Sequence, residues 1–478
     1  MNLDPISVYR TAAERVPAYD EFLRRERGEI PEVRSLDEFR ALPLMDKKNY
    51  LTRFPLAKVC LDGTLRGAHV ICRSSGSTAK PFYWPQLPEQ ERDLSTWLAT
   101  ELEDTFAVGS KPTLVIVALA LGAWISGELA TWALRSLAIE SGNITLLTPG
   151  LNRDEVVDMI AEFSPHFQQT LIYSYPPFAK NIVESAVERG IPVQDFNIRL
   201  RLAGEGYSEK FRDYVNALLG HDRNDIASIA SGYASTDFGR VGKETPLAVA
   251  VKRVLHEKDC AAAILGCDTI PSVCQFNPAG FYLEAVDGEL VITKHQAVPL
   301  IRYRSGDRGE LIGYEEFLAR FNAAGIDLLA ELQARGGDPS AVKPLPFVLV
   351  HGRADGGITF YGANIPVAQI RDILEGSSPF REHFTGNFQI RKSSDEKLDP
   401  VLELQLEEKS PGYEKDSLAA LMARELAGRS SEYAKLLEVR GDTAMPMITV
   451  VGKDFFLNSA KIRYVDRTDG QTGTSDQK

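Results

Sequence analysis

A loop rich in hydroxyl groups near residue 76 is the first segment that suggests chemistry. Residues 73–81 read R-S-S-G-S-T-A-K-P and follow a β-like run at 69–72. Hydroxyl, backbone N–H and ammonium groups gathered in one loop can bind phosphate oxygens. The loop is not a Walker A motif, which needs a glycine directly before its lysine and a hydroxyl residue after it. A solvated turn has the same composition, so the loop alone is not decisive.

Four more segments carry groups that suit a nucleotide. The stretch Y-A-S-T-D at 233–237 offers a ring to stack on a base, hydroxyls for a phosphate, and a carboxylate for Mg²⁺. The stretch Y-R-S-G-D at 303–307 predicts a tight turn that presents a carboxylate to a ribose diol. The stretch G-R-A-D at 352–355 and the lone Lys461 complete the set. Taken singly, each is more typical of a turn, a linker or an exposed charge.

The elements around these segments follow a repeating pattern. From about residue 113, apolar runs alternate with helical periodicity, and strands are predicted at 113–119, 144–147, 170–173, 198–202 and 226–230. The 198–202 strand is expected to be half-buried, because Arg199 and Arg201 alternate with apolar residues. This order predicts βαβ units in a largely parallel sheet with helices on both faces. Ligands of such sheets bind beyond the strands' carboxyl ends, where the loops at 204–206 and 232–237 would lie.

The pattern changes past residue 245. Residues 248–254, 280–284 and 289–293 are predicted to be short β segments that form a small barrel-like part. Residues 315–343 look helical and rich in loops. From residue 348 a second α+β pattern follows, with helices at 365–375 and 413–437 and strands at 388–391, 402–406 and 448–451. The polar tail at 468–478 is expected to be disordered.

Composition narrows the classes of protein. The chain has 478 residues, with 54 Lys and Arg against 66 Asp and Glu, so its net charge is −12. An acidic chain has no general attraction for nucleic acids or anionic membranes, so neither is an expected partner. The five cysteines form no C-x-x-C pair, which favours a reducing compartment. The N-terminus lacks the apolar core of a secretory signal, and the most apolar run is too short to span a bilayer. We therefore expect a cytoplasmic protein.

In their order and spacing, these segments resemble the adenylate-forming superfamily of acyl-CoA synthetases, adenylation domains and luciferases. The resemblance extends from about Leu42 to Arg467. The most similar subgroup is the phenylacetate-CoA ligase type, which has a segment similar to L-P-L-M-D-K-K-N-Y-L at 42–51 and a phosphate loop of the form S-S-G-[ST]-T-x-K-P. The implied fold class is α/β. A large N-terminal domain (1–354) has parallel sheets flanked by helices and a small β-barrel-like part, and a small α+β C-terminal lid domain covers 356–467.

The resemblance also implies a nucleotide site. The loop residues expected to bind the β- and γ-phosphates of ATP are Ser74, Ser75, Gly76, Ser77, Thr78 and Lys80. Gly204 and Glu205 would line the adenine, and Tyr233 would stack on it. Thr236 would bind the α-phosphate, and Asp237 stands where the family usually has a glutamate associated with Mg²⁺. Asp307, helped by Arg353, would bind the ribose hydroxyls.

Three further roles follow from the same resemblance. Asp355 matches the hinge between the two domains, and Lys461 matches the catalytic lysine of the mobile lid. Trp124, Ile125 and Ala234 are candidate pocket residues for the organic acid. The region around Trp124 offers few charges, which favours an aromatic or medium apolar acid, although a tryptophan that only packs in the core is an equally good interpretation.

The implied activity is that of an AMP-forming acid–thiol ligase. It activates a carboxylic acid with ATP and Mg²⁺ as an acyl-AMP, releases pyrophosphate, and transfers the acyl group to CoA. One alternative is transfer to a carrier-protein thiol, an amine or another small nucleophile, because nothing like C-x-C-G-R occurs in 315–343. Another is a nucleotide-binding relative without turnover, because Ala79 replaces a usual glycine and Asp237 a usual glutamate. Assembly as a homodimer is left open.

Overall fold

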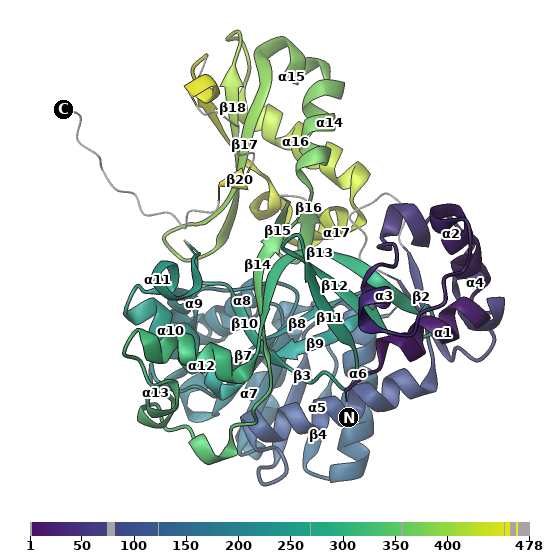
Figure 1. Cartoon of the computed structure of the whole chain (residues 1–478). Coiled ribbons are helices and arrows are strands. Elements are labelled where there is room, and N and C mark those ends of the chain that lie inside the picture. The colour runs from purple at the N-terminus through teal and green to yellow at the C-terminus, as the bar shows by residue number, and fades with distance from the viewer. Residues whose placement is uncertain are drawn as a thin grey trace. The chain divides into compact units, whose positions relative to one another are not determined.

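The computed structural model describes residues 2–73, 82–122, 124–267, 269–354, 357–453, 455–458 and 465–466 (Figure 1). The chain divides into two compact units. The first unit contains Phe82–Leu265 and Ile270–His351 together with the N-terminal segment that ends at Ser74. The second contains Gly266–Thr269 and the chain from Gly352 onward. Among the described residues, no helix is both long and apolar enough to cross a membrane.

A five-stranded parallel sheet is the centre of the first unit, which confirms the predicted α/β fold. Its order is β4-β3-β5-β6-β7, and every neighbouring pair is parallel. The strands are β3 (Thr113–Val117), β4 (Ile144–Leu147), β5 (Gln169–Ser174), β6 (Ile198–Leu202) and β7 (Ile229–Ala230). The flanking helices are α5 (Pro88–Phe106), α6 (Ile125–Ser141), α7 (Arg153–Phe163), α8 (Pro176–Glu188) and α9 (Glu209–Leu219).

Both faces of this sheet are covered. Alternate residues of a strand point to opposite faces, so Leu114 and Ile116 of β3 pack with α7, α8 and α9, whereas Val115 and Val117 pack with α5 and α6. The 198–202 strand is more deeply buried than predicted. Arg201 is buried, and its charge is paired there, because its Nε lies 2.7 Å from Oε1 of the buried Glu101 on α5. A charge inside the fold is tolerated when it is paired, and the alternating pattern alone could not reveal that partner.

A seven-stranded sheet forms the second layer of the first unit. Its order is β11-β12-β13-β14-β10-β9-β8, an open sheet in place of a closed barrel among the described strands. The bounds are β8 (Gly232–Ser235), β9 (Gly239–Lys243), β10 (Ser272–Phe276), β11 (Tyr282–Val286), β12 (Glu289–Lys294), β13 (Leu300–Ile312) and β14 (Phe347–Arg353). A two-stranded sheet, β1 (Val70–Arg73) with β2 (Tyr83–Gln86), lies apart from it. The β segments predicted at 280–284 and 289–293 match β11 and β12.

The β prediction for 248–254 is wrong, because this stretch is part of the helix α10 (Pro246–Glu257). Thr245 caps the helix by accepting a hydrogen bond from Ala248 N, and Pro246 occupies its first turn. Every residue from Leu247 to Leu255 is buried. Residues 247–251 are all apolar, and Lys252 and Arg253 are buried in ion pairs with Glu244 and Glu209. Periodicity cannot separate such a short apolar run from a buried strand. Residues 315–343 form α12 (Tyr314–Ala323) and α13 (Leu328–Ala334), as predicted.

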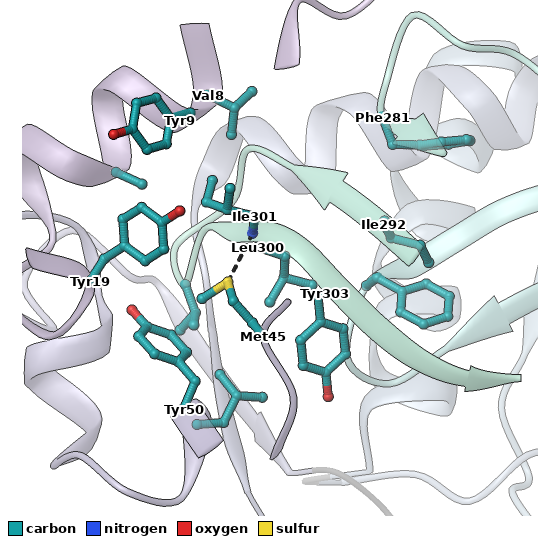
Figure 2. Close-up of a cluster of buried hydrophobic side chains, with 14 of the residues drawn as sticks. Val8, Tyr9, Tyr19, Met45, Tyr50, Phe281, Ile292, Leu300, Ile301 and Tyr303 are labelled. Atoms are coloured by element: carbon teal, nitrogen blue, oxygen red, sulfur yellow. Dashed lines mark hydrogen bonds between the residues drawn. The ribbon is translucent and has the colours of Figure 1, made fainter. Parts of the chain in front are cut away.

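The N-terminal segment packs against β12 and β13. It contains α1 (Pro5–Arg15), α2 (Pro17–Arg27), α3 (Leu36–Arg40), the π-helix Lys47–Leu51 and α4 (Leu56–Val59). Its buried side chains share one core with those of the seven-stranded sheet. Figure 2 shows Met45 lying between Tyr50 and the strand residues Leu300 and Tyr303. The N-terminal segment is thus held against the strand that carries residues 303–307.

The second unit has the predicted α+β pattern. Its four-stranded sheet has the order β19-β18-β17-β20, with β17 (Phe384–Ser394), β18 (Pro400–Glu408), β19 (Met447–Val451) and β20 (Val465–Asp466). Its helices are α14 (Val367–Gly376), α15 (Ser378–His383), α16 (Lys415–Arg429) and α17 (Ser431–Arg440). A hairpin of β15 (Ile358–Phe360) and β16 (Ala363–Ile365) precedes them. The tail at 468–478 lies outside the described residues.

Candidate active site

The segment at 232–237 is an edge hairpin, whereas the sequence predicted a loop. After β7 the chain leaves the parallel sheet, passes through Ser231, and enters the seven-stranded sheet as β8. β8 pairs antiparallel with β9, from Gly232 opposite Lys243 to Ser235 opposite Gly239. A Cβ at Gly232 would lie 2.7 Å from both Nη2 of Arg201 and the carbonyl oxygen of Gly242, so only glycine fits there. The turn between β8 and β9 presents Thr236 and Asp237.

The segment at 303–307 is also part of a strand, whereas a tight turn was predicted. All five residues belong to β13, which is 13 residues long. Val291 of β12 pairs with Arg304 and Glu289 with Arg308, so β13 carries extra residues in a bulge. Gly306 has a φ of +76°, and its N–H donates to Oε1 of Glu289 at 3.0 Å. The bulge supplies the local bend that the sequence suggested.

The hairpin and the bulge bring two predicted ligands together. The hydroxyl of Tyr233 donates to Oδ2 of Asp307 at 2.8 Å, although the two residues are 74 positions apart. Tyr233 is largely buried. The N–H of Asp307 donates to Oγ of Ser305 at 3.0 Å, which orients the bulge. An aromatic ring on the edge strand β8 and a carboxylate on β13 therefore meet, although three strands separate β8 from β13 in the order of the sheet. A base and its ribose would require such a pair.

Asp237 is the most heavily bonded residue of the hairpin turn. Its Oδ1 accepts from the Thr236 hydroxyl at 3.2 Å and lies 3.1 Å from the ammonium of Lys47. Its Oδ2 accepts from the Tyr303 hydroxyl at 2.7 Å. No pattern in the sequence indicates a role for Lys47 or for the side chain of Tyr303. The 42–51 segment was noted only for its resemblance, and no spacing pattern links it to residue 237.

Two side chains near the end of β12 hold the backbone of the turn. Gln296 Nε2 donates to the carbonyl of Asp237 at 3.0 Å, and Lys294 Nζ donates to the carbonyl of Phe238 at 2.7 Å. Burial lowers the pKa of Lys294 to about 8. The backbone that carries Thr236 and Asp237 is therefore anchored from a second strand.

A buried ionic network anchors the start of the β8–β9 hairpin. Glu244 Oε2 accepts from Ser231 N at 3.0 Å and from the Tyr207 hydroxyl at 2.7 Å. Its Oε1 lies 3.0 Å from Arg212 Nη2 and 3.0 Å from Lys252 Nζ. Burial alone would raise the pKa of Glu244, but the attraction of Lys252 and Arg212 outweighs it and lowers that pKa to about 2. The network ties the residue before β8 to the segment after Gly206.

The loop at 204–206 follows β6, as predicted for a ligand-binding loop of a parallel sheet. Gly204 has a φ of +92°, a conformation that favours glycine. Tyr207 comes directly after this loop and bonds to Glu244. Gly204 and Glu205 are thus connected through the ionic network to the start of the hairpin. Their role at an adenine ring stays a prediction.

The three residues proposed for the acid pocket occupy different environments. Trp124 caps the start of α6, and the guanidinium carbon of Arg73 lies 4.0 Å from the centre of its ring. Ile125 is buried in the same core cluster as Tyr233, and Ala234 is exposed on β8. The contact with the Arg73 guanidinium gives Trp124 a structural role, which agrees with the interpretation of Trp124 as a packing residue. Their function as a pocket stays a prediction.

Several predicted residues lie outside the described part of the chain. They are Ser74, Ser75, Gly76, Ser77, Thr78, Lys80, Asp355 and Lys461. Arg353 ends β14 and belongs to the second unit, whereas Tyr233, Asp237 and Asp307 belong to the first. The structure therefore brings together the base, ribose and α-phosphate candidates of one unit.

The donor set around Asp237 bears on the kind of metal that could bind. Among the described residues, no group of three or more His, Cys, Asp or Glu side chains could hold a metal ion. Mg²⁺ at nucleotide sites is typically bound by one or two carboxylates together with substrate phosphates and waters. A lone carboxylate beside a threonine hydroxyl fits a metal that arrives with a nucleotide, and it does not fit a permanently bound structural metal.

Replacing Asp307 with asparagine tests the ribose assignment. A hydrogen bond to a charged group contributes about 1.5–3 kcal/mol, so Asp307→Asn should weaken ATP binding about 10- to 100-fold. Tyr233→Phe keeps the ring and removes only the 2.8 Å bond, so a smaller loss of about two- to tenfold is expected. Titration calorimetry with ATP measures both. Wild-type affinity in Asp307→Asn would contradict the assignment.

Comparison with known proteins was made on sequence and on structure. No protein-family model matches this sequence, and no curated protein matches it. Among solved structures, a 2-hydroxyisobutyryl-CoA ligase in complex with 2-HIB-AMP and CoA is similar, with a TM-score of 0.64 and 16% identity over 97% of this chain and 87% of that one. An open conformation of that ligase with the same ligands gives a TM-score of 0.53 and 17% identity, covering 97% and 90%. The chain therefore shares the fold of this acyl-CoA ligase.

Proposed function

We propose that this protein is an AMP-forming acid–CoA ligase of the adenylate-forming superfamily. It activates a carboxylic acid with ATP as an acyl-AMP, releases pyrophosphate, and passes the acyl group to the thiol of CoA. The observation that carries the proposal is the meeting of Tyr233 and Asp307, joined at 2.8 Å across 74 residues, beside Thr236 and Asp237. The fold shared with a ligase solved with its acyl-AMP and CoA supports the same reading.

Each residue has a task that follows from its chemistry. Tyr233 stacks on the adenine, and Asp307 accepts hydrogen bonds from the ribose hydroxyls, helped by Arg353. Thr236 donates to the α-phosphate, where the acid's carboxylate attacks and the bond to the β-phosphate breaks. Ser74, Ser75, Gly76, Ser77, Thr78 and Lys80 bind the outer phosphates, and Gly204 and Glu205 line the base. Such donors act by being positioned before charge develops in the transition state.

The second half-reaction needs a change at the same site. The thiol attacks the carbonyl carbon of the acyl-AMP, AMP leaves, and the thiol proton is released. A lysine on a mobile lid can serve the first step and then withdraw, so we assign Lys461 to a lid domain at 356–467 that turns about Asp355. Mg²⁺, when bound through Asp237, neutralises phosphate charge.

The finer identity follows from the resemblance of the sequence. We assign the protein to the phenylacetate-CoA ligase type, acting on an aromatic or medium apolar acid held near Trp124, Ile125 and Ala234. The structure describes all five cysteines and shows no disulfide between them, which agrees with a cytoplasmic location. An acceptor other than CoA stays the main alternative, because residues 314–334 form two helices where related ligases often carry a cysteine-bearing segment.

An assay of pyrophosphate release tests the proposal and separates the acceptors. The protein is incubated with ATP, Mg²⁺ and a panel of aryl and fatty acids, with and without CoA. We expect release that depends on the acid and becomes catalytic with CoA. Release without any effect of CoA, with a hydroxamate formed on adding hydroxylamine, would favour a carrier-protein thiol or an amine as acceptor. Absence of acid-dependent release across a broad panel would contradict the ligase assignment and favour a non-catalytic nucleotide-binding protein.

A further inference from the structure

The carboxylate of Asp237 already has a cation, and that cation comes from the N-terminal segment. Lys47 Nζ lies 3.1 Å from Oδ1, while the Tyr303 hydroxyl occupies Oδ2 at 2.7 Å. The Thr236 hydroxyl also donates to Oδ1, at 3.2 Å. Both oxygens of the only carboxylate in this turn are therefore engaged by the protein itself. A divalent metal would need one of them.

The backbone before Lys47 is fixed by its contact with β13. Met45 N donates to the carbonyl of Arg302 at 3.1 Å, and Arg304 N donates to the carbonyl of Met45 at 2.8 Å. Met45 thereby pairs with Tyr303 as an isolated parallel bridge. The N–H of Ile301 donates to the Met45 sulfur, the contact drawn as a dashed line in Figure 2. The pairing of Met45 with Tyr303 therefore positions both Lys47 and Tyr303 to contact Asp237.

The turn after Met45 is fixed as well. Asp46 Oδ1 accepts from Lys48 N at 2.7 Å and from Asn49 N at 2.6 Å, and Asn49 Oδ1 accepts from Asp46 N at 2.8 Å. This reciprocal cap starts the π-helix whose first residue is Lys47. π-helical turns are rare and occur frequently at functional sites. The position of the Lys47 ammonium is therefore fixed by this capped turn and by the pairing of Met45 with β13.

This ion pair differs from the surface pairs of the chain. The side chain of Asp237 is 7% exposed and that of Lys47 is 33% exposed. A carboxylate this buried loses most of its water, so it depends on its partners more than an exposed one does. Lys47 is still reachable from solvent and can move away when a stronger cation arrives. Asp237 is thus a buried anion whose counter-cation, Lys47, can be replaced.

We propose that Lys47 is the resident counter-cation of Asp237, and that a divalent metal must displace its ammonium to reach this carboxylate. The displaced ammonium is then available for phosphate oxygens of the nucleotide that carries the metal. Tyr303, which holds the second oxygen, is a positioning residue that keeps the carboxylate aimed during the exchange. This inference rests on the proposed function only for the identity of the nucleotide.

Binding of Mn²⁺ alone to the nucleotide-free protein tests the exchange. Mn²⁺ substitutes for Mg²⁺, and the free ion is followed by its electron spin resonance signal. Removing a positive charge 3.1 Å from Oδ1 should tighten Mn²⁺ binding by about tenfold or more in Lys47→Met. The double variant Lys47→Met/Asp237→Asn should lose this gain. Unchanged Mn²⁺ affinity in Lys47→Met, or a gain that persists in the double variant, would overturn the proposal.

Matched variants separate competition for the metal from a general effect on the fold. Lys48→Met removes the neighbouring exposed lysine and should bind Mn²⁺ like the wild type. Lys47→Arg keeps the charge and should also resemble the wild type. If Lys47→Met fails to fold, as judged by its thermal melting curve, Lys47→Gln takes its place. The Mn²⁺ titration contains no nucleotide and is therefore independent of the assay of pyrophosphate release. The predicted shift in Mn²⁺ affinity, together with no acid-dependent release of pyrophosphate from ATP in that assay, would remove the ligase assignment and leave this inference standing.

Discussion

Replacing Lys461 with alanine is expected to slow acid-dependent adenylation about 10²- to 10³-fold, the usual cost of losing one positioned donor to a charged transition state. The lysine would neutralise charge that develops as the acid attacks the α-phosphorus and pyrophosphate leaves. ATP binding should stay close to wild type, because the residues assigned to the base, α-phosphate and ribose, Tyr233, Thr236 and Asp307, all belong to the first unit. Exchange of labelled pyrophosphate into ATP measures the rate, and calorimetry measures the binding.

A nearby lysine provides the control for this effect. Lys453 is exposed in the same C-terminal segment, so Lys453→Ala should leave the rate of exchange unchanged. An unchanged rate in Lys461→Ala would remove the catalytic assignment. A drop of similar size in ATP affinity would instead make Lys461 a binding residue that acts before the chemical step.

Replacing Arg212 with methionine is expected to destabilise the protein by about 3–5 kcal/mol, because it removes one cation from a buried network and leaves its carboxylates incompletely paired. The side chain of Arg212 has no exposed surface, and its Nε lies 2.9 Å from Oε2 of Glu209. Its Nη2 lies 3.0 Å from Oε1 of Glu244 and donates to the Tyr207 hydroxyl at 3.0 Å. Removing it leaves Lys252 and Arg253 as the remaining cations for these two buried carboxylates. Chemical denaturation monitored by circular dichroism measures the loss.

An exposed pair serves as the control for Arg212→Met. Arg34 and Glu32 lie 2.6 Å apart, with side chains 72% and 74% exposed. Exposed ion pairs contribute about 0–1 kcal/mol, so Arg34→Met should change the free energy of unfolding by no more than that. Equal losses in the two variants would show that the buried network has no special role in stability.

The same network predicts how stability depends on pH. Attraction by Lys252 and Arg212 lowers the pKa of Glu244 to about 2, against an ordinary value of 4.5. The folded protein therefore holds this carboxylate ionised where the unfolded chain binds a proton, and the stabilisation is present above pH 4.5 and lost as the pH falls toward 2. In Glu244→Gln the fall in melting temperature between pH 5 and pH 3 should be smaller than in the wild type. A fall of the same size would contradict this assignment.

Local patterns in the sequence predicted most of the fold. The strands at 113–119 and 144–147 follow from periodicity, which is a local property. The stretch 248–254 was misjudged because α10 is buried on all sides, and its two charged residues, Lys252 and Arg253, are buried as well. Arg201 was expected to face solvent because no residue near it in the sequence indicates that Glu101 is its partner.

The candidate site was predicted residue by residue, but its contacts were not. The tyrosine, threonine and two acids came from short motifs, whereas the bond between Tyr233 and Asp307 depends on a strand order that local patterns do not contain. Lys47 was missed because a single lysine in a helical segment has no distinctive spacing. Its segment at 42–51 was noticed as similar to a family feature, and that was the available signal for a role at the site.

A crystal structure of the protein soaked with AMP tests the central claim most directly. The claim is that the β8–β9 hairpin and the bulge of β13 form one nucleotide site. The account predicts adenine stacked on Tyr233, ribose hydroxyls bonded to Asp307, and the phosphate within hydrogen-bond distance of Thr236. AMP bound elsewhere, or a ribose whose hydroxyls do not contact Asp307, would contradict it.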